Sequence, residues 1–372
     1  MINRDRLNAT FIELCATDSE PKNERLLADK LKERLLELGF TVSEDDAGEK
    51  IGGNTGNLFA RLKETGTGEP LLFSCHMDRV TPGIGVRPRM EGNFIISDGT
   101  TVLGADDAAG LAAILEGVTA LRELNTPHPA IELVLTVAEE LALLGSRYFD
   151  LGQVTAPCGF ILDASGPVGE IVLQAPEQVK IRAVFHGLKA HAGFAPEQGI
   201  SAIQMAAVAI SRMKLLRIDP ETTANIGSIS AVGPTNIVPD RCELEAEVRS
   251  LEPEKLRLQI KGMTDALNIT AAEHGGSVEI TEISCYPAYT LAQNAEPAQR
   301  AAKAARSIGL PVRFKSTGGG SDANIFNNSG FPAIVLSCGY EAVHTTGERI
   351  AVDQLALLAQ WVLTLITDKS EG

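Results

Sequence analysis

Two adjacent carboxylates stand between glycines in the segment Gly104-Ala105-Asp106-Asp107-Ala108-Ala109-Gly110, where a loop gives way to an Ala-rich helical pattern. Aspartate is a good N-cap and is stabilised at the positive end of a helix dipole, so this pair alone predicts an acidic helix start. Other acidic and histidine residues also lie beside predicted strand ends, and together they favour a site for divalent cations. They are His76, Asp78, Glu139, Glu140, Asp163 and His344.

His76 and Asp78 are two residues apart at the end of a predicted strand, so their side chains leave the same face. The carboxylate can accept the second imidazole N–H and fix which nitrogen faces a metal. A surface His–Asp pair is the alternative interpretation of these two residues alone.

Glu139 and Glu140 are neighbours, and an extended backbone would point their side chains in opposite directions. One could then ligate a metal while the other approaches a metal-bound water from a different side. An isolated pair would indicate only a solvated strand end. The preceding run is buried and apolar, however, so repulsion between the two carboxylates favours a compensating cation.

Asp163 ends the next buried run, and His344 lies near the end of the chain. Two histidines with three carboxylates suit a pair of divalent ions, Zn²⁺ first and then Mn²⁺ or Co²⁺. Two ions about 3.5–4 Å apart can polarise a carbonyl and lower the pKa of a bridging water toward about 7. A general base beside them completes a peptide-bond hydrolase.

Strand and helix patterns alternate on both sides of these residues, which predicts an α/β fold with a mainly parallel mixed sheet flanked by helices. Ligands of such sheets bind outside the carboxyl ends of the strands, where His76, Glu139, Glu140 and Asp163 fall. The predicted helices are 3–16, 22–38, 107–124, 296–307 and 352–366, and the predicted strands are 39–42, 57–62, 70–74, 131–137, 159–162, 312–315 and 333–337.

The order of predicted strands and helices changes between the strand at 159–162 and the helix at 296–307. Strands at 179–185, 225–232, 242–249 and 277–283 alternate with helices at 199–213 and 253–273. The order β-α-β-β-α-β is typical of a ferredoxin-like unit. Residues 174–285 are therefore predicted to form a domain inserted into a metal-binding domain of 1–173 and 286–372.

Composition excludes several classes of partner. The formal charge of -15 over 372 residues disfavours nucleic acid. No apolar run reaches about 18 residues and the N-terminal residues are polar, so neither a membrane span nor a secretory signal is predicted, and the cytoplasm is favoured. The six cysteines form no Cys-x-x-Cys pair and are expected to be reduced and mostly buried.

Five segments resemble the successive motifs of the dinuclear zinc exopeptidases, the family of peptidase T, glutamate carboxypeptidases, aminoacylases and the desuccinylases of diaminopimelate synthesis. Motif order and insertion point agree through nearly the whole chain. The segments are Ser74-Cys75-His76-Met77-Asp78, Gly104-Ala105-Asp106-Asp107, Ala138-Glu139-Glu140, Leu162-Asp163-Ala164 and Val343-His344-Thr345.

The resemblance implies two zinc ions per subunit and assigns their ligands. Asp106 would bridge the ions, with His76 and Asp163 completing one site. Glu140 and His344 would complete the other.

The resemblance also implies a role for each remaining residue of these motifs. Glu139 would be the general base that activates a metal-bridging water, and Asp78 would clamp His76. A cis peptide would join Asp106 to Asp107. The chain departs from the pattern at Leu141-Ala142, where relatives often have a pair that includes glycine.

The inserted domain has motifs similar to the lid of the same family, at 187–193 and 233–240. They imply that His191 stabilises the oxyanion, that Asn236 assists substrate binding and that this domain joins a homodimer. Arg249 resembles the residue that holds a substrate carboxylate. The alternatives are a surface His, a turn Asn and an Arg in a surface ion pair. The run 318–324 resembles a glycine-rich substrate loop or a helix start capped by Ser321.

These expectations lead to a cytoplasmic two-zinc aminopeptidase of the peptidase T type, acting on tripeptides or other short peptides. The nearest alternative is an N-acyl amino acid deacylase or carboxypeptidase on the same scaffold. Larger self-compartmentalised aminopeptidases rank third, because their inserted domain lacks the His191 and Asn236 motifs. An inactive metal-binding interaction protein would be expected to have lost its base, whereas Glu139 is present.

Overall fold

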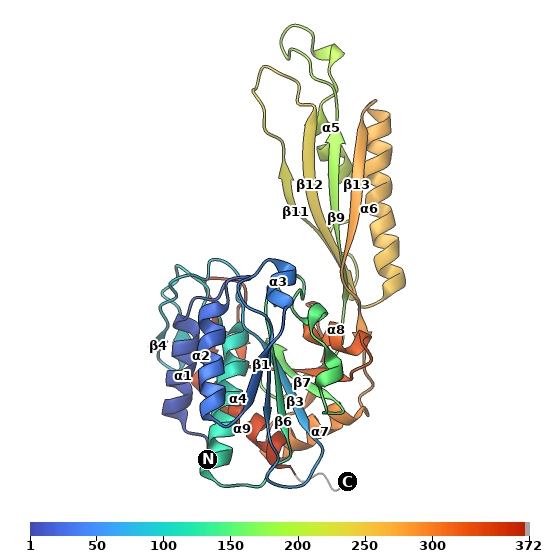
Figure 1. Cartoon of the computed structure of the whole chain (residues 1–372). Coiled ribbons are helices and arrows are strands. Elements are labelled where there is room, and N and C mark those ends of the chain that lie inside the picture. The colour runs from blue at the N-terminus through green and yellow to red at the C-terminus, as the bar shows by residue number, and fades with distance from the viewer. Residues whose placement is uncertain (369–372) are drawn as a thin grey trace. The chain divides into compact units, whose positions relative to one another are not determined.

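The computed structural model describes residues 1–368 and divides into two compact units (Figure 1). Unit 1 comprises Met1–Gln174, Thr290–Thr317 and the residues from Ser321 onward. Unit 2 comprises Ala175–Tyr289 together with Gly318–Gly320. The sequence placed the insertion at 174–285, and its pattern gave no sign that Gly318–Gly320 return to unit 2.

Unit 1 is built on a nine-stranded sheet whose centre is parallel. The order is β1-β2-β6-β3-β7-β16-β8-β14, with β15 beside β8. Strands β6, β3, β7 and β16 run parallel, so their carboxyl ends meet at one edge, as the alternating pattern predicted. The bounds are β1 Thr41–Glu44, β2 Leu58–Leu62, β3 Leu71–His76, β6 Ile131–Thr136, β7 Gly159–Ala164, β8 Glu170–Ala175, β14 Tyr289–Thr290, β15 Arg313–Ser316 and β16 Ala333–Ser337.

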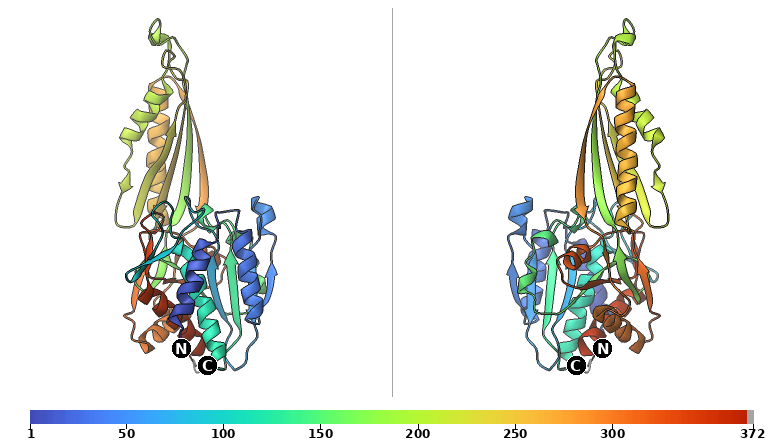
Figure 2. Two further views of the ribbon diagram at one scale, coloured as in Figure 1. Left: turned by 90° about the vertical axis from the view of Figure 1, so that its left-hand side faces the viewer. Right: turned by 90° about the vertical axis from the view of Figure 1, so that its right-hand side faces the viewer.

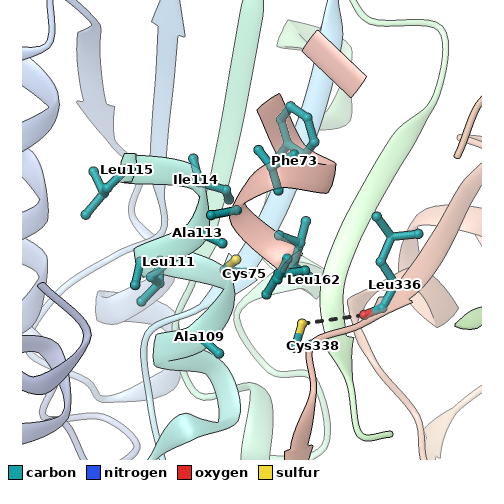
Figure 3. Packing of buried hydrophobic residues seen from close by; sticks show 14 of the residues in the cluster. Phe73, Cys75, Ala109, Leu111, Ala113, Ile114, Leu115, Leu162, Leu336 and Cys338 are labelled. Carbon is teal, nitrogen blue, oxygen red and sulfur yellow. Dashed lines mark hydrogen bonds between the residues drawn. The ribbon is translucent and has the colours of Figure 1, made fainter. Parts of the chain in front are cut away.

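Helix α4 (Ala105–Glu123) is buried along most of its length and packs against α1, α9, β3 and β7. Figure 3 shows Ile114 of this helix toward Phe73 of β3, and Leu162 of β7 belongs to the same buried cluster. This large apolar contact stabilises α4 in its position against the sheet. The other helices of unit 1 are α1 Arg4–Ala16, α2 Arg25–Glu37, α3 Ala47–Ile51, α7 Glu296–Ser307, α8 Asp322–Asn328 and α9 Val352–Thr367.

A second, small sheet was not expected from the sequence. Its order is β17-β18-β5-β4, formed by Tyr340–Glu341, Arg349–Ala351, Phe94–Ile96 and Arg89–Glu91. Pairing of β18 with β5 brings the loop between β17 and β18 beside the start of α4. Such two- and three-residue strands carry too little periodicity to be recognised in a sequence.

Unit 2 is a single antiparallel sheet with two helices on one face (Figure 2). The order β10-β11-β12-β9-β13 is that of a ferredoxin-like unit, as predicted. Its own core includes Phe185, Leu244 and Met263. The elements are β9 Glu177–His186, α5 Ala202–Arg212, β10 Leu216–Arg217, β11 Thr222–Ser230, β12 Arg241–Ser250, α6 Pro253–Glu273 and β13 Ser277–Tyr286.

Two simpler predictions can be compared with the structure. All six cysteines are buried, as expected. In Figure 3 the sulfur atoms of Cys75 and Cys338 lie among apolar side chains of the unit 1 core. None of the helices within residues 1–368 has the length and apolarity that crossing a bilayer requires.

Candidate active site

Side chains from five elements meet at the carboxyl edge of the parallel strands in unit 1. His76 ends β3, and Asp163 lies near the end of β7. Glu140 follows β6 in a one-turn 3₁₀ helix, η1 (Glu139–Leu141), while Asp106 stands at the start of α4. His344 comes from the loop between β17 and β18. The fold thus brings together all five residues that the resemblance named as ligands.

Asp106 is the centre of this group, because each of its carboxylate oxygens faces a different histidine. Oδ1 lies 3.0 Å from His76 Nε2, and Oδ2 lies 3.4 Å from His344 Nε2. His76 Nε2 is also 3.7 Å from Asp163 Oδ1, and His344 Nε2 is 3.0 Å from Glu140 Oε1. Two histidine–carboxylate groups therefore share one aspartate.

The pKa values in this group are shifted because several acidic side chains are buried close together. Burial raises the pKa of Asp163 to about 7, and the neighbouring Asp106 charge adds to the effect. Burial alone would lower the pKa of His76, but hydrogen bonds to Asp106, Asp163 and Asp78 raise it well above its usual range. Asp106 and Glu140 raise the pKa of His344 to about 10. A cation bound among these groups would therefore compete with protons for them.

This donor set fits divalent cations. Ligand atoms of His76, Asp106 and Glu140 all lie within 4.8 Å of one another. Burial, together with the charge of Asp106, raises the pKa of Glu140, so a cation there would relieve both the desolvation and the like-charge crowding. Imidazole nitrogen and carboxylate oxygen are ligands that Zn²⁺ and Mn²⁺ accept.

The sequence indicated either helix capping or cation binding for Asp106 and Asp107, and the structure divides these roles between them. Both have non-helical backbone angles, and the predicted cis peptide joins them. The Asp107 carboxylate binds backbone amides: its Oδ1 accepts a hydrogen bond from Gly110 N at 3.2 Å and its Oδ2 one from His76 N at 3.3 Å. Asp107 therefore caps the helix, and Asp106 is left to the site.

The prediction that Glu139 and Glu140 lie in extended backbone is wrong. They form η1, which is entered through Ala138 at φ 49° and left through Ala142 at φ 66°. The departure from glycine at Ala142 thus places an alanine in left-handed backbone, a conformation that costs about 1–2 kcal/mol for a residue with a Cβ. The positions of the two glutamates are therefore set by this turn and not by strand geometry.

Asp78 contacts His76 mainly through its backbone. His76 Nδ1 donates to the Asp78 main-chain oxygen at 2.9 Å, whereas the nearest carboxylate oxygen is 3.5 Å away. The Asp78 carboxylate instead accepts hydrogen bonds from Glu139 N at 2.9 Å and Glu140 N at 3.0 Å. One residue thus orients the imidazole and also holds the turn that carries both glutamates.

Glu24 is a further participant that sequence reasoning missed. Its carboxylate accepts Ala138 N at 2.9 Å, while Asn57 Oδ1 accepts Val137 N at 3.0 Å. Burial, with the charge of Asp78, raises the pKa of Glu24 to about 7. With the Asp78 contacts, four consecutive amides from 137 to 140 are held by side chains. No local pattern around Glu24 signals this role.

Tyr340 and Glu348 flank the loop that bears His344, and both were also missed. The Tyr340 hydroxyl lies 3.4 Å from Asp106 Oδ1 and 3.3 Å from Asp163 Oδ1, as a donor to each. Glu348 is 2% exposed and accepts backbone hydrogen bonds at the start of α4. Glu348 belongs to the run Val343-His344-Thr345-Thr346-Gly347-Glu348, so its spacing from His344 was the available signal.

The predicted residues of unit 2 lie in a different setting. His191 and Asn236 are exposed on two loops joined by the hydrogen bond from Ala192 N to Asn236 O at 2.9 Å. His191 Nδ1 accepts hydrogen bonds from Gly193 N at 3.2 Å and Phe194 N at 3.0 Å. The imidazole hydrogen is therefore on Nε2, which faces outward from these contacts.

Arg249 is already engaged within unit 2. Its Nε and Nη2 donate to the Glu247 carboxylate at 2.9 and 3.2 Å, and Nη1 lies 3.3 Å from the Tyr286 hydroxyl. Gly320 packs against the same ring, because a Cβ there would lie 2.3 Å from Tyr286 Cζ. The ion-pair interpretation thus describes the observed contacts of Arg249, and Nη1 is the nitrogen that Glu247 does not hold.

Family models match both parts of the chain. Residues 178–275 match the peptidase dimerisation domain of family M20. Residues 57–185 match the model of peptidase family M28, and this range includes His76, Asp106, Glu139, Glu140 and Asp163.

Similar proteins align over almost the full length. The chain is 43% identical to the uncharacterized protein YqjE of Bacillus subtilis over 100% of both chains. It is 25% identical to peptidase T of Vibrio cholerae over 94% of each.

Two solved structures share the fold closely. One is aminopeptidase PepT from Bacillus cereus, with 44% identity, a TM-score of 0.87 and 98% of each chain covered. The other is a tripeptidase from Staphylococcus aureus, with 43% identity, a TM-score of 0.93 and coverage of 99% of this chain and 98% of that one. The full-length matches and the shared insertion lead to one assignment: the chain belongs to the peptidase T-like group of the M20 metallopeptidase family.

Proposed function

We propose that this enzyme is a metal-dependent aminopeptidase that cleaves tripeptides. The observation that carries the proposal is Asp106, shared by two histidine–carboxylate groups beside the buried Glu139. Identity of 43–44% over nearly the whole chain to a tripeptidase and to aminopeptidase PepT supports the substrate class.

The proposed ions are two, with zinc as the first choice and Mn²⁺ or Co²⁺ as alternatives. His76, Asp106 and Asp163 would hold one, and Asp106, Glu140 and His344 the other. Bound there, divalent ions supply Lewis acidity toward the scissile carbonyl and lower the pKa of water.

Glu139 is the proposed general base. It is buried, and burial together with the Asp163 charge raises its pKa well above its usual range, so its carboxylate has a strong affinity for a proton. Glu139 would take the proton from the attacking water and return it to the leaving amine. The hydrogen bond from Glu139 N to Asp78 fixes the backbone from which this side chain projects.

Unit 2 would supply the polar contacts to substrate. Because two backbone amides occupy His191 Nδ1, its Nε2–H is free to donate to the developing oxyanion. Asn236, on the adjoining loop, would bind the substrate backbone. Arg249 would hold the substrate carboxylate through Nη1, since Glu247 already occupies its other two nitrogens.

A homodimer through unit 2 is part of the proposal, and the two edges of its sheet differ. Strand β11 (Thr222–Ser230) pairs with the two-residue β10 at Thr223 and Ala224 and forms the open edge beyond them; it has no charged residue, and Ile229 is 49% exposed there. The opposite edge, β13, carries exposed Glu279 and Glu282, which oppose edge pairing. A second copy pairing along β11 is therefore favoured. Ile229→Lys should convert a dimer to monomers in sedimentation velocity, whereas Ile283→Lys on β13 should leave the dimer intact.

The cytoplasm is the proposed location, because six buried cysteines without a Cys-x-x-Cys pair suit a reducing compartment. Purified protein loaded with zinc should hydrolyse tripeptides with a free amino terminus and release the first residue. N-acetylated tripeptides and N-acyl amino acids should stay intact. Cleavage of the acylated compounds with intact free tripeptides would instead support the deacylase or carboxypeptidase alternative. Measuring metal content on the same preparation tests the two-ion stoichiometry.

A further inference from the structure

We propose that Glu348 is a positioning residue that ties the loop bearing His344 to the backbone presenting Asp106, and so sets the affinity of both metal ions. The inference rests on the proposed function in that Asp106 and His344 act as ligands. Within residues 1–368, the hydrogen bonds that the Glu348 carboxylate accepts come from backbone amides and not from the side chain of a proposed ligand.

The carboxylate of Glu348 accepts hydrogen bonds from three backbone amides at and just before the start of α4. Its Oε2 accepts Gly104 N at 2.7 Å and Leu103 N at 2.9 Å, and its Oε1 accepts Asp106 N at 3.1 Å. Amides at a helix start have no partner within the helix, and a buried one without a partner is costly. Both oxygens of Glu348 are therefore required, one on each side of Ala105.

Neighbouring contacts leave this backbone little alternative. Gly104 adopts φ +74°, and a Cβ there would lie 3.0 Å from Arg79 Nε. The Arg79 guanidinium donates to the main-chain oxygens of Leu14, Cys15 and Thr17 and is 3% exposed as a residue. The loop before Asp106 is thus confined between a fixed guanidinium and the Glu348 carboxylate.

Glu348 is also built into the loop of His344. Its own amide donates to Thr345 O at 3.2 Å, which closes a turn directly after His344. The next residues enter β18, where Ile350 pairs with Ile95 of β5. A displacement of Glu348 would therefore move His344 and Asp106 relative to each other. Because Asp106 faces both histidines, the displacement should affect the two ions alike.

Glu348→Gln tests this role, because an amide has one acceptor oxygen and cannot serve both groups of amides. Supports of metal ligands commonly contribute 10- to 100-fold to metal affinity. We expect Glu348→Gln to weaken binding of both Co²⁺ ions by about 10- to 100-fold in a titration of the metal-free full-length protein. The visible Co²⁺ spectrum should change as well, because the ligand geometry loosens.

Glu132→Gln is the matched control. Glu132 is also fully buried and accepts hydrogen bonds from Thr155 N and Ala156 N, but it lies at the opposite end of β6 from the site. The control should lower the free energy of unfolding and keep Co²⁺ affinity within about twofold of wild type. Equal Co²⁺ affinity and equal spectra for Glu348→Gln and wild type would overturn the proposal.

Two further outcomes of the Co²⁺ titration have distinct meanings. If Glu348→Gln does not fold, Glu348→Asp decides by the same titration: it keeps the charge but is one methylene shorter, so weakened Co²⁺ binding supports the role and wild-type binding overturns it. If wild-type protein itself fails to bind two ions, the proposed function falls. A wild type that binds two ions beside an unaffected Glu348→Gln removes only the inference about Glu348.

Discussion

The two units present their polar residues in opposite ways. In unit 1, Asp106, Glu139 and Glu140 project from backbone whose amides are held by the buried carboxylates of Asp78 and Glu348. In unit 2, His191 and Asn236 stand on exposed loops that are joined mainly to each other. The difference indicates that the acidic centre is organised by its own unit, while the unit 2 loops only present donors outward.

A physical reason underlies this contrast. Five carboxylates and two imidazoles can be kept close together only if the surrounding structure resists their repulsion. Buried hydrogen bonds from amides to charged carboxylates are strong and directional, so they suit that task. A single neutral imidazole needs no such enclosure. Substitutions of the proposed ligands and of their supports in unit 1 should therefore change metal binding or the fold, and those in the unit 2 loops should change turnover alone.

The largest effect should come from Glu139→Gln. Loss of the proposed base should lower kcat for tripeptides by about 100- to 10,000-fold, because the amide cannot accept the proton from water. Two bound ions per chain should remain, since Glu139 is not a proposed ligand. Glu33→Gln, on the exposed side of α2, serves as the control and should behave as wild type. Undiminished hydrolysis by Glu139→Gln would contradict the assignment of the base.

His191→Ala should produce the next largest effect. Removal of one oxyanion donor should lower kcat by about 100- to 1,000-fold. Its metal stoichiometry and free energy of unfolding should match wild type, because His191 is exposed and bonded only within its loop. His186→Ala in the same unit provides the control, since His186 lies on β9 near Glu279 and should leave kcat unchanged. Loss of metal from His191→Ala would contradict the expectation that the unit 2 loops do not affect metal binding.

Glycine substitutions should give the smallest effect, and they compare the two units by the change in the free energy of unfolding. Gly104→Ala places a Cβ at φ +74° and 3.0 Å from Arg79 Nε, so it should lower the free energy of unfolding by about 1–2 kcal/mol. Gly233→Ala, in the Asn236 loop, meets no described atom within 4 Å and should change it by less than about 0.5 kcal/mol. Urea unfolding with excess chelator measures both without a metal contribution. Similar losses would show that the unit 2 loop is also tightly packed.

Sequence patterns predicted the long elements well. Helices α6 (Pro253–Glu273) and α7 (Glu296–Ser307) and strand β16 (Ala333–Ser337) have the predicted bounds, because each has strong periodicity or an uninterrupted apolar run. The sheet of β17, β18, β5 and β4 was missed because its strands have only two or three residues, and because the β18–β5 pairing joins segments more than two hundred residues apart in the chain. Local signals do not contain such pairings.

The acidic site was predicted in its side chains but not in its supports. His76 and Asp163 could be placed because each ends a buried strand, and the motif order indicated the rest. The 3₁₀ turn at Glu139 depends on left-handed Ala138 and Ala142, which alanine does not signal. Glu24 and Glu348 act through backbone amides, whose acceptors are set by tertiary packing and leave no trace in local sequence.

The position of β16 has a consequence for biosynthesis. This strand lies between β7 and β8 in the sheet, although unit 2 is translated before it. On the ribosome, four of the proposed ligands emerge early, and β7 then lacks its neighbour on one side. His344 and Glu348 leave the exit tunnel only after unit 2 is complete. The nascent enzyme thus acquires its full cation centre only after unit 2 has been synthesised.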